Sequence, residues 1–121
     1  MGTVLIVDDD HALLEVASSM VQRTGFRVLC ASSGSEAVEL FQKNLDLVMA
    51  ALVDWRMPDM DGGEVACALH QMKPDIKILL SSGYSEEFVM QAVASGVPLN
   101  FIQKPYSFEQ LKTKLREVLD A

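Results

Sequence analysis

The chain has 121 residues, of which half are hydrophobic and 22% are charged. This length suits a single domain, and so high an apolar content excludes an intrinsically disordered chain. The formal net charge of −7, from 17 acidic and 10 basic residues, argues against direct nucleic-acid binding, which depends on Lys and Arg beside the phosphates.

The sequence shows no membrane or export signal. The longest unbroken apolar run, Leu47 to Val53, is far shorter than the ~20 residues that span a bilayer. The first residues have neither the basic region nor the cleavage pattern of a signal peptide. Cys30 and Cys67 stand in no metal or redox spacing, so we expect two buried free thiols in a reducing compartment. A cytoplasmic protein without membrane insertion is the expectation.

Apolar runs and helical periodicities alternate through the first half of the chain. Val4 to Val7 predicts a strand, and the helical spacing that follows stops at Gly25. Phe26 to Ala31 predicts a second strand. Ser33, with Glu36 three residues later, resembles a capping box that opens a second helix.

The alternation continues beyond the second helix. Leu47 to Val53 predicts a third strand, and a third helix lies between Gly62 and Pro74. Ile76 to Leu80 predicts a fourth strand, and Ser81-Ser82-Gly83 predicts the loop beyond it.

The last third of the chain adds one more helix, strand and helix. Ser85 can cap a helix that Gly96 closes, Leu99 to Ile102 predicts a fifth strand, and Ser107 can cap the final helix. Apolar strands between amphipathic helices indicate a parallel sheet covered on both faces. With right-handed crossovers, the predicted fold is a three-layer, doubly wound α/β domain with five parallel strands.

Polar residues stand where the predicted strands end. Ligands of such sheets bind beyond the carboxyl ends of the strands. These ends carry carboxylates, hydroxyls and one ammonium, which should therefore meet at one edge: Asp8-Asp9-Asp10, Asp54, Ser81-Ser82 and Gln103-Lys104-Pro105.

The crowded carboxylates indicate a metal site. Two carboxylates ~5 Å apart repel each other by about 3 kcal/mol at an effective dielectric near 20. A hard divalent ion removes this conflict, and Mg²⁺ prefers a few carboxylates together with water and phosphate oxygens. The alternative is that Asp8 to Asp10 only cap the first helix, a role that we expect of Asp10 alone.

Asp54 is the candidate nucleophile. A carboxylate held at the end of an apolar strand can attack phosphorus and form an acyl phosphate. Pro105 restricts Lys104 to extended backbone, which can aim the ammonium at phosphoryl oxygens. Ser82 can donate a hydroxyl to the same group. The alternatives are an exposed surface lysine and a serine that merely forms a turn.

With these residues the chain resembles the receiver domains of bacterial two-component systems, and it does so over essentially its whole length. We therefore expect residues 1–121 to form one receiver domain with the flavodoxin-like strand order 2-1-3-4-5. The resemblance rests on four segments: Leu5-Ile6-Val7-Asp8-Asp9-Asp10, Val53-Asp54-Trp55-Arg56-Met57-Pro58-Asp59-Met60-Asp61-Gly62, Leu80-Ser81-Ser82-Gly83 and Gln103-Lys104-Pro105-Tyr106.

The resemblance also implies a role for each site residue. Asp8 and Asp9 bind Mg²⁺, Asp54 accepts the phosphoryl group, and the backbone carbonyl of Arg56 is a further metal ligand. Lys104 matches the invariant lysine of the family. The switch serine or threonine corresponds to Ser82, and the aromatic switch residue to Phe101, for which a plain core role is equally open.

A mechanism and partners follow from the same resemblance. A phosphohistidine of a histidine kinase or phosphotransfer domain donates to Asp54. Ser82 and Phe101 then shift, and the face of the fourth helix, fifth strand and fifth helix changes its affinity for an effector, an output domain or, after phosphorylation, a second copy. Such a domain acts on no substrate other than itself. It is either a stand-alone receiver or a piece of a larger regulator or hybrid kinase.

Departures and rivals remain. We interpret Met49-Ala50-Ala51 as an insertion, so we expect an altered second helix or following loop. Arg56 and Tyr84 flank the site, and we predict that they slow autodephosphorylation. An aspartyl phosphatase would need a second Asp at position 56, and a flavodoxin needs hydroxyl-rich phosphate turns. A non-phosphorylated pseudo-receiver that only binds partners is the main alternative function.

Overall fold

The computed structural model describes residues 2–93 and 96–120, and within them five strands alternate with five helices. The strands are β1 (Thr3–Val7), β2 (Arg27–Ala31), β3 (Val48–Asp54), β4 (Lys77–Ser82) and β5 (Asn100–Gln103). The helices are α1 (His11–Arg23), α2 (Gly34–Lys43), α3 (Gly62–Met72), α4 (Glu86–Ala92) and α5 (Phe108–Asp120).

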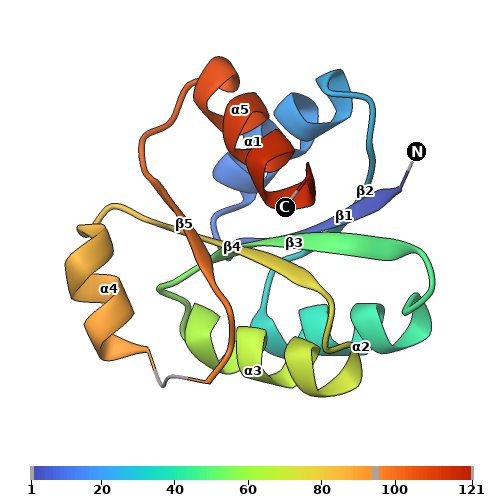
Figure 1. Cartoon of the computed structure of the whole chain (residues 1–121), viewed down its shortest axis with the longest axis vertical. Coiled ribbons are helices and arrows are strands. Elements are labelled where there is room, and N and C mark those ends of the chain that lie inside the picture. The colour runs from blue at the N-terminus through green and yellow to red at the C-terminus, as the bar shows by residue number, and fades with distance from the viewer. Residues whose placement is uncertain (1, 94–95, 121) are drawn as a thin grey trace.

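All strand pairs are parallel, and the sheet order is β2-β1-β3-β4-β5. Figure 1 shows α1 and α5 on one face of the sheet and α2, α3 and α4 on the other. The predicted three-layer, doubly wound α/β fold is confirmed, as is the strand order 2-1-3-4-5.

Two hydrophobic clusters hold the layers together. Side chains of a strand alternate between faces, so Leu5 and Val7 pack with α2 and α3, whereas Val4 and Ile6 pack with α1 and α5. On the α2 side Phe41 is fully buried, as is Leu111 on the α5 side. Burial of a side chain of this size stabilises a fold by about 1.5–3 kcal/mol.

The helix starts follow the predicted caps in most cases. Ser85 accepts the N–H of Phe88 at the start of α4, and Gly25 follows α1 with a φ of 102°. At α2 the capping box is only half formed, because the Glu36 carboxylate accepts the N–H of Ser32 and not that of the N-cap Ser33.

The start of α3 carries the full capping box that we did not predict. Asp61 accepts the N–H of Glu64, and the Glu64 carboxylate accepts the N–H of Asp61. The loop after β3 therefore ends on a well-defined helix start.

The three residues of the predicted insertion, Met49-Ala50-Ala51, all lie inside β3. In the pairing with β1, Thr3 is opposite Val48 and Val4 is opposite Ala50, so the register shifts between them and Met49 has no partner. A bulge of this kind absorbs one residue without disturbing the rest of the strand.

Several predicted strand limits are wrong by a few residues. The fourth strand continues through Ser81 and Ser82, which we had assigned to the loop, because both pair with neighbouring strands. Leu47 is 58% exposed and precedes β3. Apolar periodicity does not register backbone pairing, so it cannot set such limits.

The prediction of two buried cysteines is also wrong. Cys30 is exposed, because β2 is an edge strand whose side chains are only partly covered. Cys67 is half-buried on α3, at a groove whose other side includes Ala92 and Val93 of the α4 end. Both are free thiols. No helix among the described residues is long and apolar enough to cross a membrane.

Candidate functional site at the carboxyl edge of the sheet

The carboxyl ends of β1 and β3 bring three aspartates together. Asp8 directly follows β1, Asp54 is the last residue of β3, and the two strands are parallel neighbours. Carboxylate oxygens of Asp8, Asp9 and Asp54 lie within 4.8 Å of one another. Asp8 and Asp54 are buried, whereas Asp9 is exposed. The strand-end pattern thus located a cluster that the fold assembles from two separate segments.

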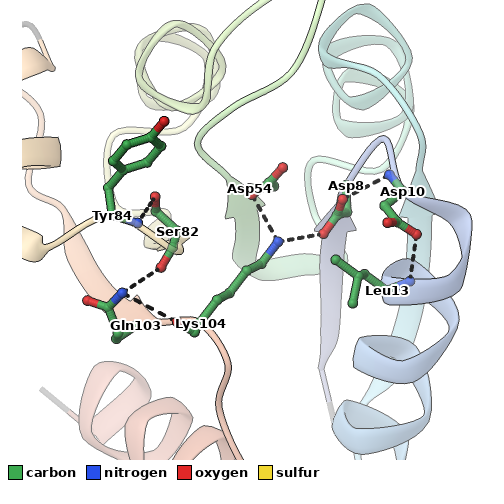
Figure 2. A network of polar contacts seen from close by, with 8 residues as sticks. All are labelled: Asp8, Asp10, Leu13, Asp54, Ser82, Tyr84, Gln103 and Lys104. Carbon is green, nitrogen blue, oxygen red and sulfur yellow. Dashed lines mark hydrogen bonds and ion pairs between the residues drawn. The ribbon is translucent and has the colours of Figure 1, made fainter.

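Lys104 lies across this cluster. Its Nζ donates to Asp8 Oδ2 and to Asp54 Oδ1, at 3.0 Å each. Figure 2 shows the side chain reaching from the end of β5 to the space between the two carboxylates. The peptide bond between Lys104 and Pro105 is cis. The lysine is therefore a partly buried ion-pair partner, and the alternative of an exposed surface charge does not hold.

The electrostatics of the cluster are unbalanced. Burial raises the pKa of the Asp54 carboxyl; the hydrogen bond and charge of Lys104 oppose this, and the charges of Asp8 and Asp9 add to it. Burial lowers the pKa of Lys104, but its hydrogen bonds to Asp8 and Asp54 and the charges of these two carboxylates together hold that pKa above its ordinary value. Three carboxylates beside one ammonium leave a net negative charge, which a bound cation could neutralise.

The donor set fits Mg²⁺. Three carboxylate oxygens are hard ligands of the kind that Mg²⁺ prefers. They lie within 4.8 Å of one another, a spacing at which they could hold one metal ion. Asp8, Asp9 and Asp54 are thus suited to hold the ion, and the backbone carbonyl of Arg56, two residues after Asp54, stays a predicted ligand.

Asp10 has the capping role that we predicted for it. Its carboxylate accepts the N–H groups of Ala12 and Leu13 at 3.0 and 3.2 Å, at the start of α1. Asp8 in turn accepts the N–H of Asp10 at 3.0 Å. Asp10 therefore caps α1, and its N–H orients the carboxylate of Asp8 in the cluster.

Ser82 ends β4, the strand next to β3 in the sheet. It is 2% exposed and accepts the N–H of Tyr84 on its Oγ at 3.0 Å. Ser81 is equally buried but pairs directly with Asp54 in the sheet. Successive strand side chains point to opposite faces, so Ser81 and Ser82 do not face the same side of the sheet, and the choice of Ser82 as the switch residue stays a prediction.

An aromatic cluster lies between the two loops that flank the site. Tyr84 stacks on Phe88 with ring centroids 5.2 Å apart, and Trp55 meets both rings edge-on at 5.6 and 5.8 Å. The Arg56 guanidinium lies 5.6 Å from the Trp55 ring and 5.7 Å from that of Tyr84. Arg56 and Tyr84 are therefore close partners at the mouth of the site.

Phe101 lies in the core. It is 6% exposed in β5, opposite Leu80 in the sheet, and belongs to the cluster on the α2 and α3 side. This position agrees with a plain core role and leaves its function as a switch residue a proposal.

Two residues within the quoted segments have contacts that we did not foresee. Asp59 accepts the N–H groups of Gly34 and Ser35 at 3.1 and 3.0 Å, which ties the loop after β3 to the start of α2. Gln103 donates to backbone carbonyls of the loop after β4. Both contacts join segments that are distant in the sequence. The sole sequence signal for them is a polar side chain at a strand end or in a turn.

Comparison with known proteins identifies the family. The sequence model described as "Response regulator receiver domain" matches residues 4–116. The chain belongs to this family. It is a receiver domain of two-component response regulators. The chain is 34% identical over 122 residues to the sensor kinase CckA of Brucella abortus, and the match covers 98% of this chain and 13% of the kinase.

Two solved structures are similar along the whole receiver domain. The chemotaxis protein CheY4 of Vibrio cholerae is 28% identical, with a TM-score of 0.85 and coverage of 98% of this chain and 99% of that one. The response regulator TrrA of Thermotoga maritima, in complex with Mg(2+)-BeF, is 28% identical, with a TM-score of 0.82 and coverage of 98% and 100%. The receiver domain spans between 13% and 53% of curated relatives such as CckA and the regulator TmoT of Ectopseudomonas mendocina.

Proposed function

We propose that the receiver domain accepts a phosphoryl group on Asp54 from a phosphohistidine of a histidine kinase or a histidine phosphotransfer domain. The observation that carries this proposal is the 3.0 Å contact of Lys104 Nζ with both Asp8 and Asp54 inside a cluster of three carboxylates. Phosphoryl transfer depends mainly on positioning and on stabilisation of negative charge, and this arrangement supplies both.

Mg²⁺ is the cofactor of this proposal. Asp8, Asp9 and Asp54 would hold it, together with the backbone carbonyl of Arg56. When bound, Mg²⁺ neutralises charge on the carboxylates and on the phosphoryl oxygens. Mg(2+)-BeF bound to the relative TrrA supports this choice of metal.

The residues of the chain have distinct tasks in the transfer. An oxygen of Asp54 attacks phosphorus, the bond between phosphorus and the donor imidazole nitrogen breaks, and the imidazole keeps the electron pair and takes up a proton. Lys104 exchanges its bond to Asp54 for one to a phosphoryl oxygen. The Ser82 hydroxyl gives up its hydrogen bond with the N–H of Tyr84 and donates to a second phosphoryl oxygen. Later hydrolysis returns Asp54 and inorganic phosphate.

An apolar groove beside the site suits the donor. Leu13 and Val16 of α1 are 44% and 50% exposed, and they line a groove of about 460 Å³ with Lys104, Pro105 and Tyr106. Lys104 joins this groove to Asp54. An amphipathic helix that presents a phosphohistidine would bury this surface and bring phosphorus to the carboxylate.

The output is a change of partner affinity. Phosphorylation must provide about 5.5 kcal/mol of differential stabilisation to turn a mostly inactive domain into a mostly active one. The dianion with Lys104, Ser82 and a metal around it can supply this through charge-assisted hydrogen bonds. Ser82 and Phe101 would pass the change to the face of α4, β5 and α5, which binds an effector, an output domain or a second copy.

The scope of the domain belongs to the same proposal. Residues 1–121 act as one receiver in the cytoplasm, where kinases hold their phosphohistidines. The domain catalyses only its own phosphorylation and dephosphorylation and turns over no other substrate. A pseudo-receiver that is never phosphorylated is the alternative, and the complete set of Asp8, Asp9, Asp54 and Lys104 weakens it.

The test is incubation with acetyl phosphate or phosphoramidate and Mg²⁺, followed by intact mass spectrometry. We expect one added phosphoryl group, which does not form when EDTA removes Mg²⁺ and is absent in the Asp54→Ala variant. Asp46→Ala, at an exposed aspartate outside the cluster, is the matched control and should be labelled like the unmodified chain. A chain that stays unlabelled by every donor, including a phosphorylated phosphotransfer domain, would be a pseudo-receiver.

A further inference from the structure

Gln103 makes an unusual set of contacts at the end of β5. Gln103 is an exposed residue, and its side-chain Nε2 donates to the carbonyl oxygens of Gly83, Ser82 and Lys104 at 2.8, 3.3 and 3.3 Å. Figure 2 shows the amide between the backbone of Ser82 and the backbone of Lys104. One side chain therefore serves two segments that each carry a residue of the site.

These contacts extend the pairing of β4 with β5 beyond its last rung. Ser82 and Gln103 are the final register partners, and the N–H of Lys104 donates to the carbonyl of Ser82 at 2.7 Å. The paired strands end here, because β4 stops at Ser82 and β5 stops at Gln103. Beyond the last strand pair, the Gln103 amide provides the hydrogen bonds between these two segments.

The position demands a neutral donor. Three carbonyl oxygens converge on Nε2, and an amide offers two N–H groups without adding charge. A carboxylate of the same shape would place negative oxygens against those carbonyls. An apolar chain of the same length would leave the Gly83 carbonyl without this partner.

We propose that Gln103 is a positioning residue for phosphoryl binding, which holds the backbones of Ser82 and Lys104 at the spacing that lets both side chains reach one phosphoryl group. This rests on the proposed function of Ser82 and Lys104. Gln103 itself touches neither the metal ligands nor the reacting carboxylate in any contact seen among the described residues. Its loss should therefore weaken phosphoryl binding and leave metal binding unchanged.

The size of the effect follows from the contacts. One typical intramolecular hydrogen bond shifts an equilibrium by roughly twofold to tenfold. The bond to Gly83 is short and the other two are long, so the sum is close to one good bond. We expect a loss of about three- to tenfold in affinity for a phosphoryl mimic.

The experiment compares Gln103→Glu and Gln103→Met with the unmodified chain by isothermal titration calorimetry. One titration uses Mg²⁺ alone, and a second uses beryllofluoride in saturating Mg²⁺. Gln42→Glu is the matched control, since Gln42 is an exposed glutamine on α2 and carries the same change of charge. Melting temperatures verify that each variant is folded, and Gln103→Met provides a neutral change if the glutamate variant unfolds.

We expect equal Mg²⁺ affinity in all chains and weaker beryllofluoride binding in both Gln103 variants only. Equal beryllofluoride affinity throughout would overturn the role of Gln103, and so would a parallel loss of Mg²⁺ affinity, which indicates general damage. If the unmodified chain binds no beryllofluoride in Mg²⁺, the proposed function fails first and this inference with it.

Discussion

The two loops that border the site are built in different ways. The loop after β3, residues 55–61, has backbone hydrogen bonds at both ends: the N–H of Trp55 donates to Ser81 at 2.9 Å, and the N–H of Gly62 donates to Trp55 at 2.8 Å. The carboxylate of Asp59 adds a link to the start of α2. The loop after β4, residues 83–85, is exposed and held by the Ser82 hydroxyl and the Gln103 amide.

This difference matches the tasks that we propose for the two loops. The first loop follows Asp54 and carries Arg56, so a fixed backbone would keep the proposed metal ligands in place at little cost when an ion binds. The second follows Ser82, whose hydroxyl must exchange partners during phosphorylation. A few side-chain hydrogen bonds can be exchanged singly, whereas close backbone packing cannot.

The largest expected difference comes from one glycine in each loop region. A Cβ on Gly62 would lie 2.8 Å from the Asp54 carbonyl oxygen and 2.9 Å from Trp55 Cα, so backbone would have to move. A Cβ on Gly83 would meet nothing within 4 Å. We expect Gly62→Ala to lower the free energy of unfolding by about 1–3 kcal/mol, as other overpacked sites do.

Gly83→Ala is the matched control for that substitution. It should leave the free energy of unfolding unchanged or raise it by up to about 1 kcal/mol, because alanine restricts the unfolded chain. Urea unfolding of both variants measures the contrast. Equal stability of the two would contradict the idea that only the first loop is closely packed.

A smaller effect is expected where the two loops meet. The Arg56 guanidinium and the Tyr84 ring lie 5.7 Å apart at the mouth of the site, where they can exclude attacking water. Replacing Arg56 by Asn and Tyr84 by Ala should speed the loss of phosphate from Asp54 several-fold, followed by intact mass after removal of the donor. Phe88→Ala, in the same aromatic cluster but farther along α4, is the control. An unchanged decay rate in the double variant counts against this shielding.

The smallest effect concerns the anchor of the first loop. Hydrogen bonds from the backbone of Ser35 and Gly34 hold the pKa of Asp59 below its ordinary 3.8. A carboxyl with a lowered folded pKa stabilises the protein above its unfolded pKa, and this contribution is lost as the pH falls through the folded value. Asp59→Asn should thus be less stable than the unmodified chain near neutral pH, and the gap should close in acid.

Urea unfolding at a series of pH values from about 6 down to 2.5 measures this gap across the range where an aspartate titrates. Asp75→Asn, at an exposed aspartate in the turn before β4, is the control. A gap that stays constant over the whole range would show that the Asp59 charge does not anchor the loop.

Much of the architecture could be predicted because its signals are local. Apolar alternation and helical spacing depend on neighbours a few residues away, which is why ten elements and the caps at Asp10, Ser33 and Ser85 appear in the right order. The strand-end rule then placed Asp8, Asp54 and Lys104 at one edge before any contact was known.

What the sequence could not supply are contacts between segments far apart in the chain. Lys104 meets Asp8 across 96 residues and Asp54 across 50. The exposure of Cys30 depends on β2 being an edge strand, and the bulge at Met49 depends on the register with β1. None of these features can be predicted from the spacing of apolar and polar residues within one helix or strand.

The sequence by itself therefore determined the order of the elements, the class of the fold and the kinds of chemical group at the edge of the sheet. The tertiary structure decided which groups touch: Lys104 between two carboxylates, Gln103 across two loops, and Asp59 on a distant helix. The physical reason is that periodicity records burial along one element, whereas hydrogen bonds between elements depend on how those elements are placed in space.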